Sequence, residues 1–162
     1  MKKYKHSVDV GLSFGLTSGL ITSIGLMVGV YSGTESTTAV LSSIVTIAVA
    51  DAMSDALGIH IAEESENVHT AKEIWLATLI TFFAKFFVSA SFIIPLLVFS
   101  LKTAVIVNIC YGTLLMVAYN YVIGINQQRN PFSIILEHLL IATVVIICSF
   151  FLGKWIKLNF TT

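Results

Sequence analysis

Five long apolar stretches, separated by short polar connections, dominate the hydrophobic pattern of this chain. They cover residues 8–31, 37–62, 71–99, 103–125 and 131–156. A helix of about 20 mostly apolar residues crosses the hydrocarbon core of a bilayer, and lipid forces each segment to satisfy its own backbone hydrogen bonds. The pattern therefore predicts an all-α integral membrane protein, with five transmembrane helices packed as one bundle and one domain over residues 1–162.

The composition agrees with this prediction. Hydrophobic residues make up 56% of the chain, charged residues only 11%, and the mean hydropathy is +0.91. Nine basic and nine acidic residues cancel, so no net charge favours a nucleic-acid partner. Cys110 and Cys148 lie inside apolar stretches, which predicts small buried hydrophobic residues rather than a disulfide or a metal site.

The basic residues predict how the chain is oriented. One side of a five-span arrangement carries Lys2, Lys3, Lys5, Lys72 and Arg129, and the other carries Lys102, Lys154 and Lys157. Cytoplasmic loops are enriched in Lys and Arg, so we expect a cytoplasmic N-terminus and a C-terminus outside. The first apolar stretch is too long for a signal-peptide core, and we expect it to remain as a membrane helix. With no organelle signal, a prokaryotic plasma membrane is the expected location.

Small residues recur every three or four positions along the first stretch, at Gly11, Gly15, Ser18, Thr22, Gly25, Gly29 and Gly33. This spacing places them on one helix face, and such faces let membrane helices approach closely. The pattern favours helix packing, above all through the glycines. A pore wall with room for an ion is the alternative, and it needs a charged helix opposite.

Two carboxylates in the second stretch are the strongest chemical signal. Asp51 and Asp55 are four residues apart and share a helix face, and Glu66 continues nearly the same angular position. Each ionised side chain at mid-membrane costs about 2.5–3.5 kcal/mol on insertion scales. A proton, a fixed cation or a transported cation could offset that cost. Lys85 is a possible charge partner, but one lysine cannot neutralise two acids, so the pattern favours an ion or proton path over a purely structural cluster.

The polar segment after Asp55 predicts a cytoplasmic entrance formed by His60, Glu63, Glu64 and Glu66. The spacing of His60 from the two following acids can bring an imidazole and two carboxylates together, and negative charge concentrates cations at a mouth. A solvated helix end is the equally weighted alternative.

Two features of the later stretches complete the sequence predictions. Pro95 predicts a kink in the third helix. Glu137 and His138 lie near the start of the last helix, where contacts to neighbouring groups are favoured over a second proton site.

The second stretch, AVADAMSDALGIHIAEESE, resembles a segment of the vacuolar iron transporters of the type AGAISMGLGEYLAAKSE. FGLTSGLITSIGLMVGV in the first stretch is similar to the family's GANDGLVSTFALVAGV, and the final hairpin from Gly124 to Ile156 is similar as well. The resemblance implies a homodimer with an ion path between the first two helices of each subunit. It also implies export of Fe²⁺ or Mn²⁺ from the cytoplasm in exchange for protons, with no tightly bound cofactor and no enzymatic activity.

The chain departs from the family pattern at the positions of the pore ligands. Ser18 stands at the family's pore aspartate and Asp55 at its pore methionine, and only a short acidic linker replaces the metal-binding insert of some relatives. Exchanging a thioether for a carboxylate favours harder cations such as Mn²⁺, Mg²⁺ or Ca²⁺. We expect Asp51 and Asp55 of two subunits to form a four-carboxylate ring beside Ser18 and Thr22 that alternates between protons and one divalent cation.

Two other functions remain open at this point. A membrane scaffold or metal sensor without ion flux would also use a glycine face and would not need the family's ligands. An intramembrane metal-dependent enzyme would need more carboxylates and a basic group to hold phosphate, and the membrane stretches offer only Lys85 for the second role.

Overall fold

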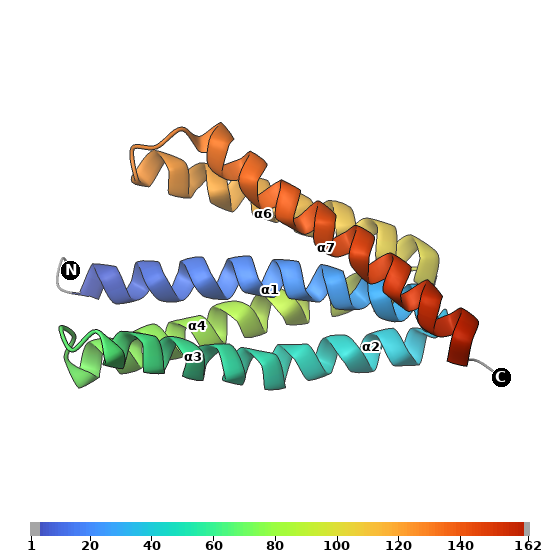
Figure 1. Cartoon of the computed structure of the whole chain (residues 1–162), viewed down its shortest axis with the longest axis horizontal. Helices are drawn as coiled ribbons and strands as arrows, with labels where there is room; N and C mark the ends of the chain where they lie inside the picture. The colour runs from blue at the N-terminus through green and yellow to red at the C-terminus, as the bar shows by residue number, and fades with distance from the viewer. Residues whose placement is uncertain (1–3, 161–162) are drawn as a thin grey trace.

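The computed structural model describes residues 4–160, and these form helices joined by short connections (Figure 1). Five helical spans in this part of the chain are long and apolar enough to cross a membrane, so the chain is an integral membrane protein. The elements are α1 (Lys5–Thr34), α2 (Thr37–Thr46), the π-helical segment η2 (Ile47–Asp51), α3 (Ala52–Ser65), α4 (Ala71–Ser91), α5 (Ile93–Val98), α6 (Leu101–Asn126) and α7 (Pro131–Phe160). α2, η2 and α3 together make the second span, and α4 and α5 make the third.

Helix ends extend beyond the apolar stretches because polar side chains complete the terminal turns. The Ser36 hydroxyl accepts a hydrogen bond from the backbone N–H of Ala39 at the start of α2. Thr70 and Glu73 form a capping box at the start of α4. Glu35 ends α1 in the left-handed region with φ 50°.

The kink expected at Pro95 is present as a break between α4 and α5 at Phe92. A proline has no N–H and its ring collides with the carbonyl four residues earlier, here that of Ser91, so the helix is interrupted just before it. The side-chain amide of Asn108 on α6 donates to the carbonyl of Phe92 at 2.9 Å. A buried asparagine on α6 thereby contacts the backbone directly at the break.

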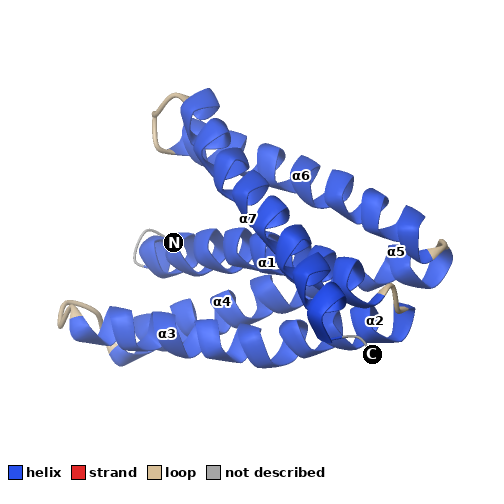
Figure 2. Cartoon of the chain, turned by 45° about the vertical axis from the view of Figure 1, so that its right-hand side comes forward, coloured by secondary structure: helices blue, strands red, loops and turns tan. Residues whose placement is uncertain are grey.

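The first helix lies at the centre of the bundle. α1 makes its most extensive contacts with α4 on one side and α7 on the other (Figures 1 and 2). The α6–α7 hairpin approaches α1 near the C-terminus and diverges from it toward the end where α1 begins. That end, which we call the N-terminal end of the bundle, also carries the α3–α4 and α6–α7 connections. The core lies along α1, with Leu20, Ile24 and Met27 buried against its neighbours.

The glycines of α1 fall into two groups with different neighbours. A Cβ on Gly11 or Gly15 would lie 2.8 or 2.7 Å from a backbone oxygen of α4. A Cβ on Gly25 would lie 2.6 Å from Val145 of α7, and one on Gly29 would lie 3.5 Å from Ser149. The small-residue face therefore holds α4 with its first half and α7 with its second, and Ser18 and Thr22 lie between the two contacts.

One expectation for the cysteines is wrong. Cys110 and Cys148 are both free and both exposed on the outside of the described chain rather than buried. Their flanking residues are apolar because the outer surface of a membrane bundle faces lipid. In such a chain an apolar sequence context therefore does not distinguish core from surface.

Substitution of the two kinds of glycine tests this packing. We expect Gly15→Ala to lower the free energy of unfolding by about 1–3 kcal/mol, because the new methyl group meets backbone and cannot be accommodated by a rotamer change. Gly58→Ala is the matched control, since a Cβ there meets nothing within 4 Å. Gly58→Ala should leave stability unchanged or raise it by about 0.5–1 kcal/mol. Thermal unfolding in detergent would measure both, and equal effects would contradict the close α1–α4 contact.

The end of α7 is joined to the end of α1 by an ion pair outside the spans. The Lys157 ammonium donates to the Glu35 carboxylate at 2.6 Å, and this contact holds the pKa of Glu35 below its ordinary value. Because the folded-state pKa is the lower one, the stabilisation is present above the unfolded-state pKa and is lost as the pH falls through the folded-state value.

Carboxyl titration by NMR should therefore give Glu35 a lower pKa in the wild type than in Lys157→Met. The comparison is made at low salt, because an exposed pair is screened at high salt. Equal pKa values in the two proteins would show that the pair does not persist in solution.

Candidate functional site

A fully buried lysine is the centre of the candidate site. Lys85 lies in the middle of α4 with 0% of its surface exposed. Its ammonium nitrogen is 2.5 Å from Oδ2 of Asp51 and donates a short hydrogen bond to Oδ2 of Asp55. It also donates to the Ser18 hydroxyl at 3.0 Å, and that hydroxyl in turn donates to Asp55 at 2.6 Å. Three spans thus contribute to one ionic cluster, which consists of Ser18, Asp51, Asp55 and Lys85.

The charges of the ionic cluster do not cancel when all groups are ionised. Two carboxylates and one ammonium leave a single net negative charge, and one further positive charge would balance it. The two acids also differ in access, because the side chain of Asp51 is 36% exposed and that of Asp55 is 20% exposed. Oδ2 of Asp51 is close to Lys85, yet within residues 4–160 no donor meets it with the angles of a hydrogen bond. Asp51 is therefore the more accessible of the two acids.

A π-helical segment supplies Asp51. In η2 the backbone N–H of Ala52 reaches back to the carbonyl of Ile47, five residues earlier, and Asp51 is the last residue of this wider turn. Such single π turns inside α-helices are frequent at functional sites.

The π turn fits the spacing of the residues that the second span buries. The buried residues of the second span before Glu63 recur at strict four-residue intervals, at Val40, Ile44, Ala48, Ala52 and Ala56. In a regular α-helix this interval would rotate the buried face by about 40° at each step. The wider turn offsets part of that rotation, so α2 and α3 both face the bundle.

Two cavities flank the ionic cluster along α1. The first, of about 590 Å³, lies between α1, α6 and α7 and is lined by Ser13, Thr17, Ser18, Asn120, Glu137 and His138 among others. The second, of about 760 Å³, runs along the second group of glycines of α1 against α7, and Asp51 lines it. Both cavities include Ile21 and Thr22 in their walls. The two cavities thus share one turn of α1 as a wall, and each also has a member of the ionic cluster in its lining.

The residues expected at the entrance do not form the predicted group. Nδ1 of His60 lies 3.0 Å from the hydroxyl of Thr78, and the ring packs edge-on against Trp75, so this imidazole belongs to the α3–α4 contact. Glu64 is exposed at the end of α3. Helical spacing permits a contact among neighbours, but the tertiary partner of His60 determines where its side chain points.

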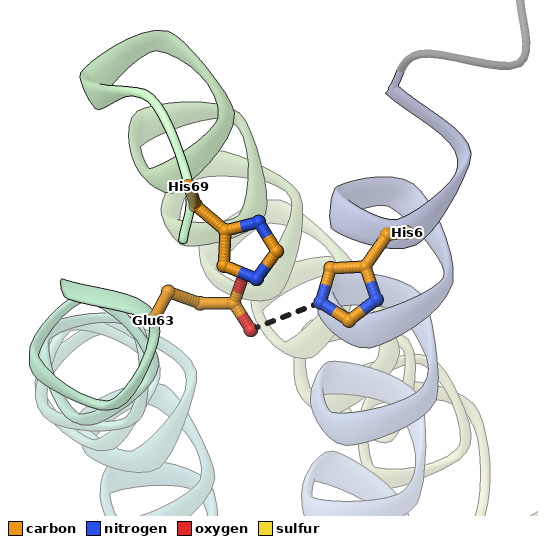
Figure 3. A group of neighbouring side chains, drawn as sticks. All are labelled: His6, Glu63 and His69. Atoms are coloured by element: carbon orange, nitrogen blue, oxygen red, sulfur yellow. Dashed lines mark ion pairs between the residues drawn. The ribbon is translucent and has the colours of Figure 1, made fainter. Parts of the chain in front are cut away.

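The other two acids of that segment have histidine partners. Glu63 is buried, with 5% exposure, between His6 and His69 (Figure 3). Glu66 is exposed, with its carboxylate 3.3 Å from His69. Glu66 follows the end of α3, about 16 Å along the helix axis from Asp55, so the expected stripe of three carboxylates is not one site.

The remaining predicted residues lie near the first cavity. Glu137 and His138 both line it, although the ring of His138 is also bonded to the carbonyl of Ile134 in its own helix, at 2.9 Å. The hydroxyl of Thr22 donates to the carbonyl of Ser18 at 2.8 Å. Sequence reasoning did not identify Asn120, which is buried on α6 and contributes an amide to the cavity wall.

Comparisons with protein-family models, with curated proteins and with solved structures find no match to this chain. The resemblance to the vacuolar iron transporters therefore stays a prediction from the sequence.

Removal of the lysine tests whether it compensates the two acids. Lys85→Met should lower the free energy of unfolding by about 3–5 kcal/mol, because it leaves two carboxylates without their buried cation. The double variant Lys85→Met/Asp55→Asn should recover part of that loss, since it also removes one of the uncompensated charges. Thermal unfolding in detergent measures both, and a single variant as stable as the wild type would contradict the pairing.

Proposed function

We propose that this protein is a membrane transporter that moves a divalent metal cation, Mn²⁺ or Fe²⁺, in exchange for protons. Asp51 and Asp55 are the ion-binding groups, and Ser18 and Thr22 form the wall opposite them. The observation that carries the proposal is the ionic cluster itself, in which a fully buried Lys85 contacts two partly exposed aspartates within the membrane spans, with Ser18 in the wall of one cavity and Asp51 in the wall of the other. Ionisable groups inside a membrane are costly and commonly mark ion pathways.

Charge balance in a poorly solvated site predicts how many protons are exchanged for each metal cation. With no metal, one acid carries a proton, the other is ionised and Lys85 is an ammonium, so the site is neutral. With M²⁺ between two carboxylates, the site is neutral when Lys85 has lost its proton. Loading one cation then releases two protons, one from a carboxyl group and one from Lys85. Buried sites favour such neutral states because an uncompensated charge is expensive, and metal binding generally displaces protons from its ligands.

In this proposal Lys85 is a fixed competitor of the transported cation. Its ammonium contacts both acids, so it occupies the position that M²⁺ would need. The metal can bind only when the ammonium withdraws or becomes neutral, and the return of a proton to Lys85 favours release. Competition for the same carboxylates couples the two ions without a separate proton site.

A second copy of the chain would complete the site. Asp51 is one-third exposed in the middle of a span, where an ionised side chain in contact with lipid is unfavourable. A homodimer that pairs the Asp51 faces would cover both groups and would place four carboxylates around one axis. Oxygen ligands of this kind suit Mn²⁺ better than softer metals. With the expected cytoplasmic N-terminus, the first cavity would lie on the cytoplasmic side of the ionic cluster.

A non-transporting scaffold or metal sensor is the alternative function. The contact of Lys85 with both acids favours it, because a closed ionic cluster can hold three spans together without ion movement. An enzymatic function has no comparable observation in its favour. Ion flux separates the two candidates.

Flux into proteoliposomes tests the proposal. Added Mn²⁺ should change the pH on neither side of the membrane in protein-free vesicles. In vesicles that contain the protein, Mn²⁺ entry should drive protons in the opposite direction, at two protons per cation and without dependence on membrane potential. Asp51→Asn and Asp55→Asn should each lower the flux at least about tenfold, because each removes a ligand charge. Glu64→Gln is the control, since it removes an exposed acid outside the ionic cluster.

Two results would overturn the proposal. Folded wild-type protein that moves none of Mn²⁺, Fe²⁺, Co²⁺, Mg²⁺ or Ca²⁺ would favour the scaffold or sensor. Flux that is equal in wild type and in both Asp variants would remove Asp51 and Asp55 from the path.

A further inference from the structure

We propose that His6, Glu63 and His69 form a binding site for a divalent transition-metal ion at the N-terminal end of the bundle. The three side chains come from three separate segments: the first turn of α1, the end of α3 and the α3–α4 connection (Figure 3). The site does not rest on the proposed transport. It lies about 12 Å along α3 from Asp55 and uses none of the residues of the ionic cluster.

The distances fit a metal site with little adjustment. Nε2 of His6 is 3.4 Å from one carboxylate oxygen of Glu63, and Nε2 of His69 is 3.6 Å from the other. One ligand atom from each of the three residues lies within 4.8 Å of the others. Ligands bound to a tetrahedral metal at about 2.0–2.1 Å are separated from one another by about 3.3–3.4 Å. Small side-chain rotations therefore bring all three to one ion.

The burial of Glu63 is a second, independent observation. This glutamate is only 5% exposed, although it lies at a helix end where solvent is near. Within the described chain its Oε2 has no hydrogen-bond donor. A buried carboxylate oxygen without a donor costs free energy, and this one lies 3.6 Å from Nε2 of His69. A bound cation would satisfy that oxygen directly.

The two imidazoles are arranged in a way that suits neutral rings. The rings of His6 and His69 are stacked, with their centroids 4.7 Å apart and their planes 13° from parallel. Two imidazolium rings in this position would repel each other. A metal ion instead binds neutral imidazoles and supplies the positive charge that Glu63 lacks.

The donor set determines the class of ion. Two nitrogen ligands and one oxygen ligand suit Zn²⁺, Fe²⁺, Co²⁺ or Ni²⁺, whereas Mg²⁺ and Ca²⁺ prefer oxygen ligands throughout. Three protein ligands leave a position for water or a further ligand. Glu66 is within reach of it, since its carboxylate is 3.3 Å from Nε2 of His69. Because the ligands lie on separate segments, a bound ion would also fix the start of α1 to the α3–α4 connection.

Binding of Co²⁺ and Zn²⁺ to the purified full-length protein in detergent tests the site. The wild type should bind one equivalent of Co²⁺ with the visible absorption of nitrogen and oxygen ligands, and Zn²⁺ should displace it. Zn²⁺ should also raise the unfolding temperature of the wild type, because it binds only the folded state. Mg²⁺ at the same concentration should do neither.

Substitutions assign the ion to these residues. His6→Ala, His69→Ala and Glu63→Gln should each weaken binding by more than about tenfold. His60→Ala and Glu64→Gln are matched controls from the same segment, and both should leave binding unchanged. The variant Asp51→Asn/Asp55→Asn should keep this equivalent of Co²⁺ even when all transport is lost, so the failure of one proposal does not decide the other.

Two outcomes would overturn the site. One is a wild-type protein that binds neither Co²⁺ nor Zn²⁺. The other is a His6→Ala/His69→Ala variant that binds them as the wild type does. If Glu63→Gln fails to fold, the His6→Ala variant still decides the matter, because the side chain of His6 is 53% exposed and its truncation leaves no buried charge.

Discussion

The pairing of one lysine with two aspartates is the interaction on which the arrangement of the bundle depends. Lys85 is fully buried and its ammonium needs anionic partners, which are the two carboxylates of the second span. This requirement fixes the rotation of α4 about its axis, the rotation of α3, and the side of α1 that presents Ser18. Apolar packing between membrane helices offers little such specificity, because lipid is as good a partner as another leucine. A few polar contacts therefore decide which faces meet.

Along α1, close backbone packing and specific polar contacts likewise occur at different positions. Its glycines bring the backbones of α4 and α7 close at two separate places. Between them, Ser18 and Thr22 lie in the walls of the cavities instead of against a neighbouring backbone. One helix face thus combines two tight contacts with an intervening open section. Polar groups at other points of the interior have local roles, as Asn108 does at the helix break.

The sequence predicted the five spans, the break before Pro95 and the shared face of Asp51 and Asp55, because hydrophobic length, proline chemistry and helical period are local properties. It did not predict that Lys85 reaches both acids, since this depends on the rotation of α4 relative to two other spans. The π turn that ends at Asp51 was also missed, because which apolar residues of this span are buried is decided by the fold. His6 and His69 meet Glu63 only through the fold. His60 was assigned to the wrong group because its partner, Thr78, is distant in sequence.

The uneven spacing between α1 and α7 has a mechanical consequence. The two helices touch backbone to backbone where Gly153 meets Gly29 and Gly33, and they separate toward the opposite end of the bundle (Figure 1). The hydrogen bonds from Ser32 to the Phe150 carbonyl and from Lys157 to Glu35 tie the two helices beside this contact, so it is the fixed end of a long arm. From Gly153 to Pro131 the helix extends about 33 Å, so a tilt of about 10° about this point displaces the far end by about 6 Å. The first cavity lies along that arm, and its width follows the tilt of a single hairpin.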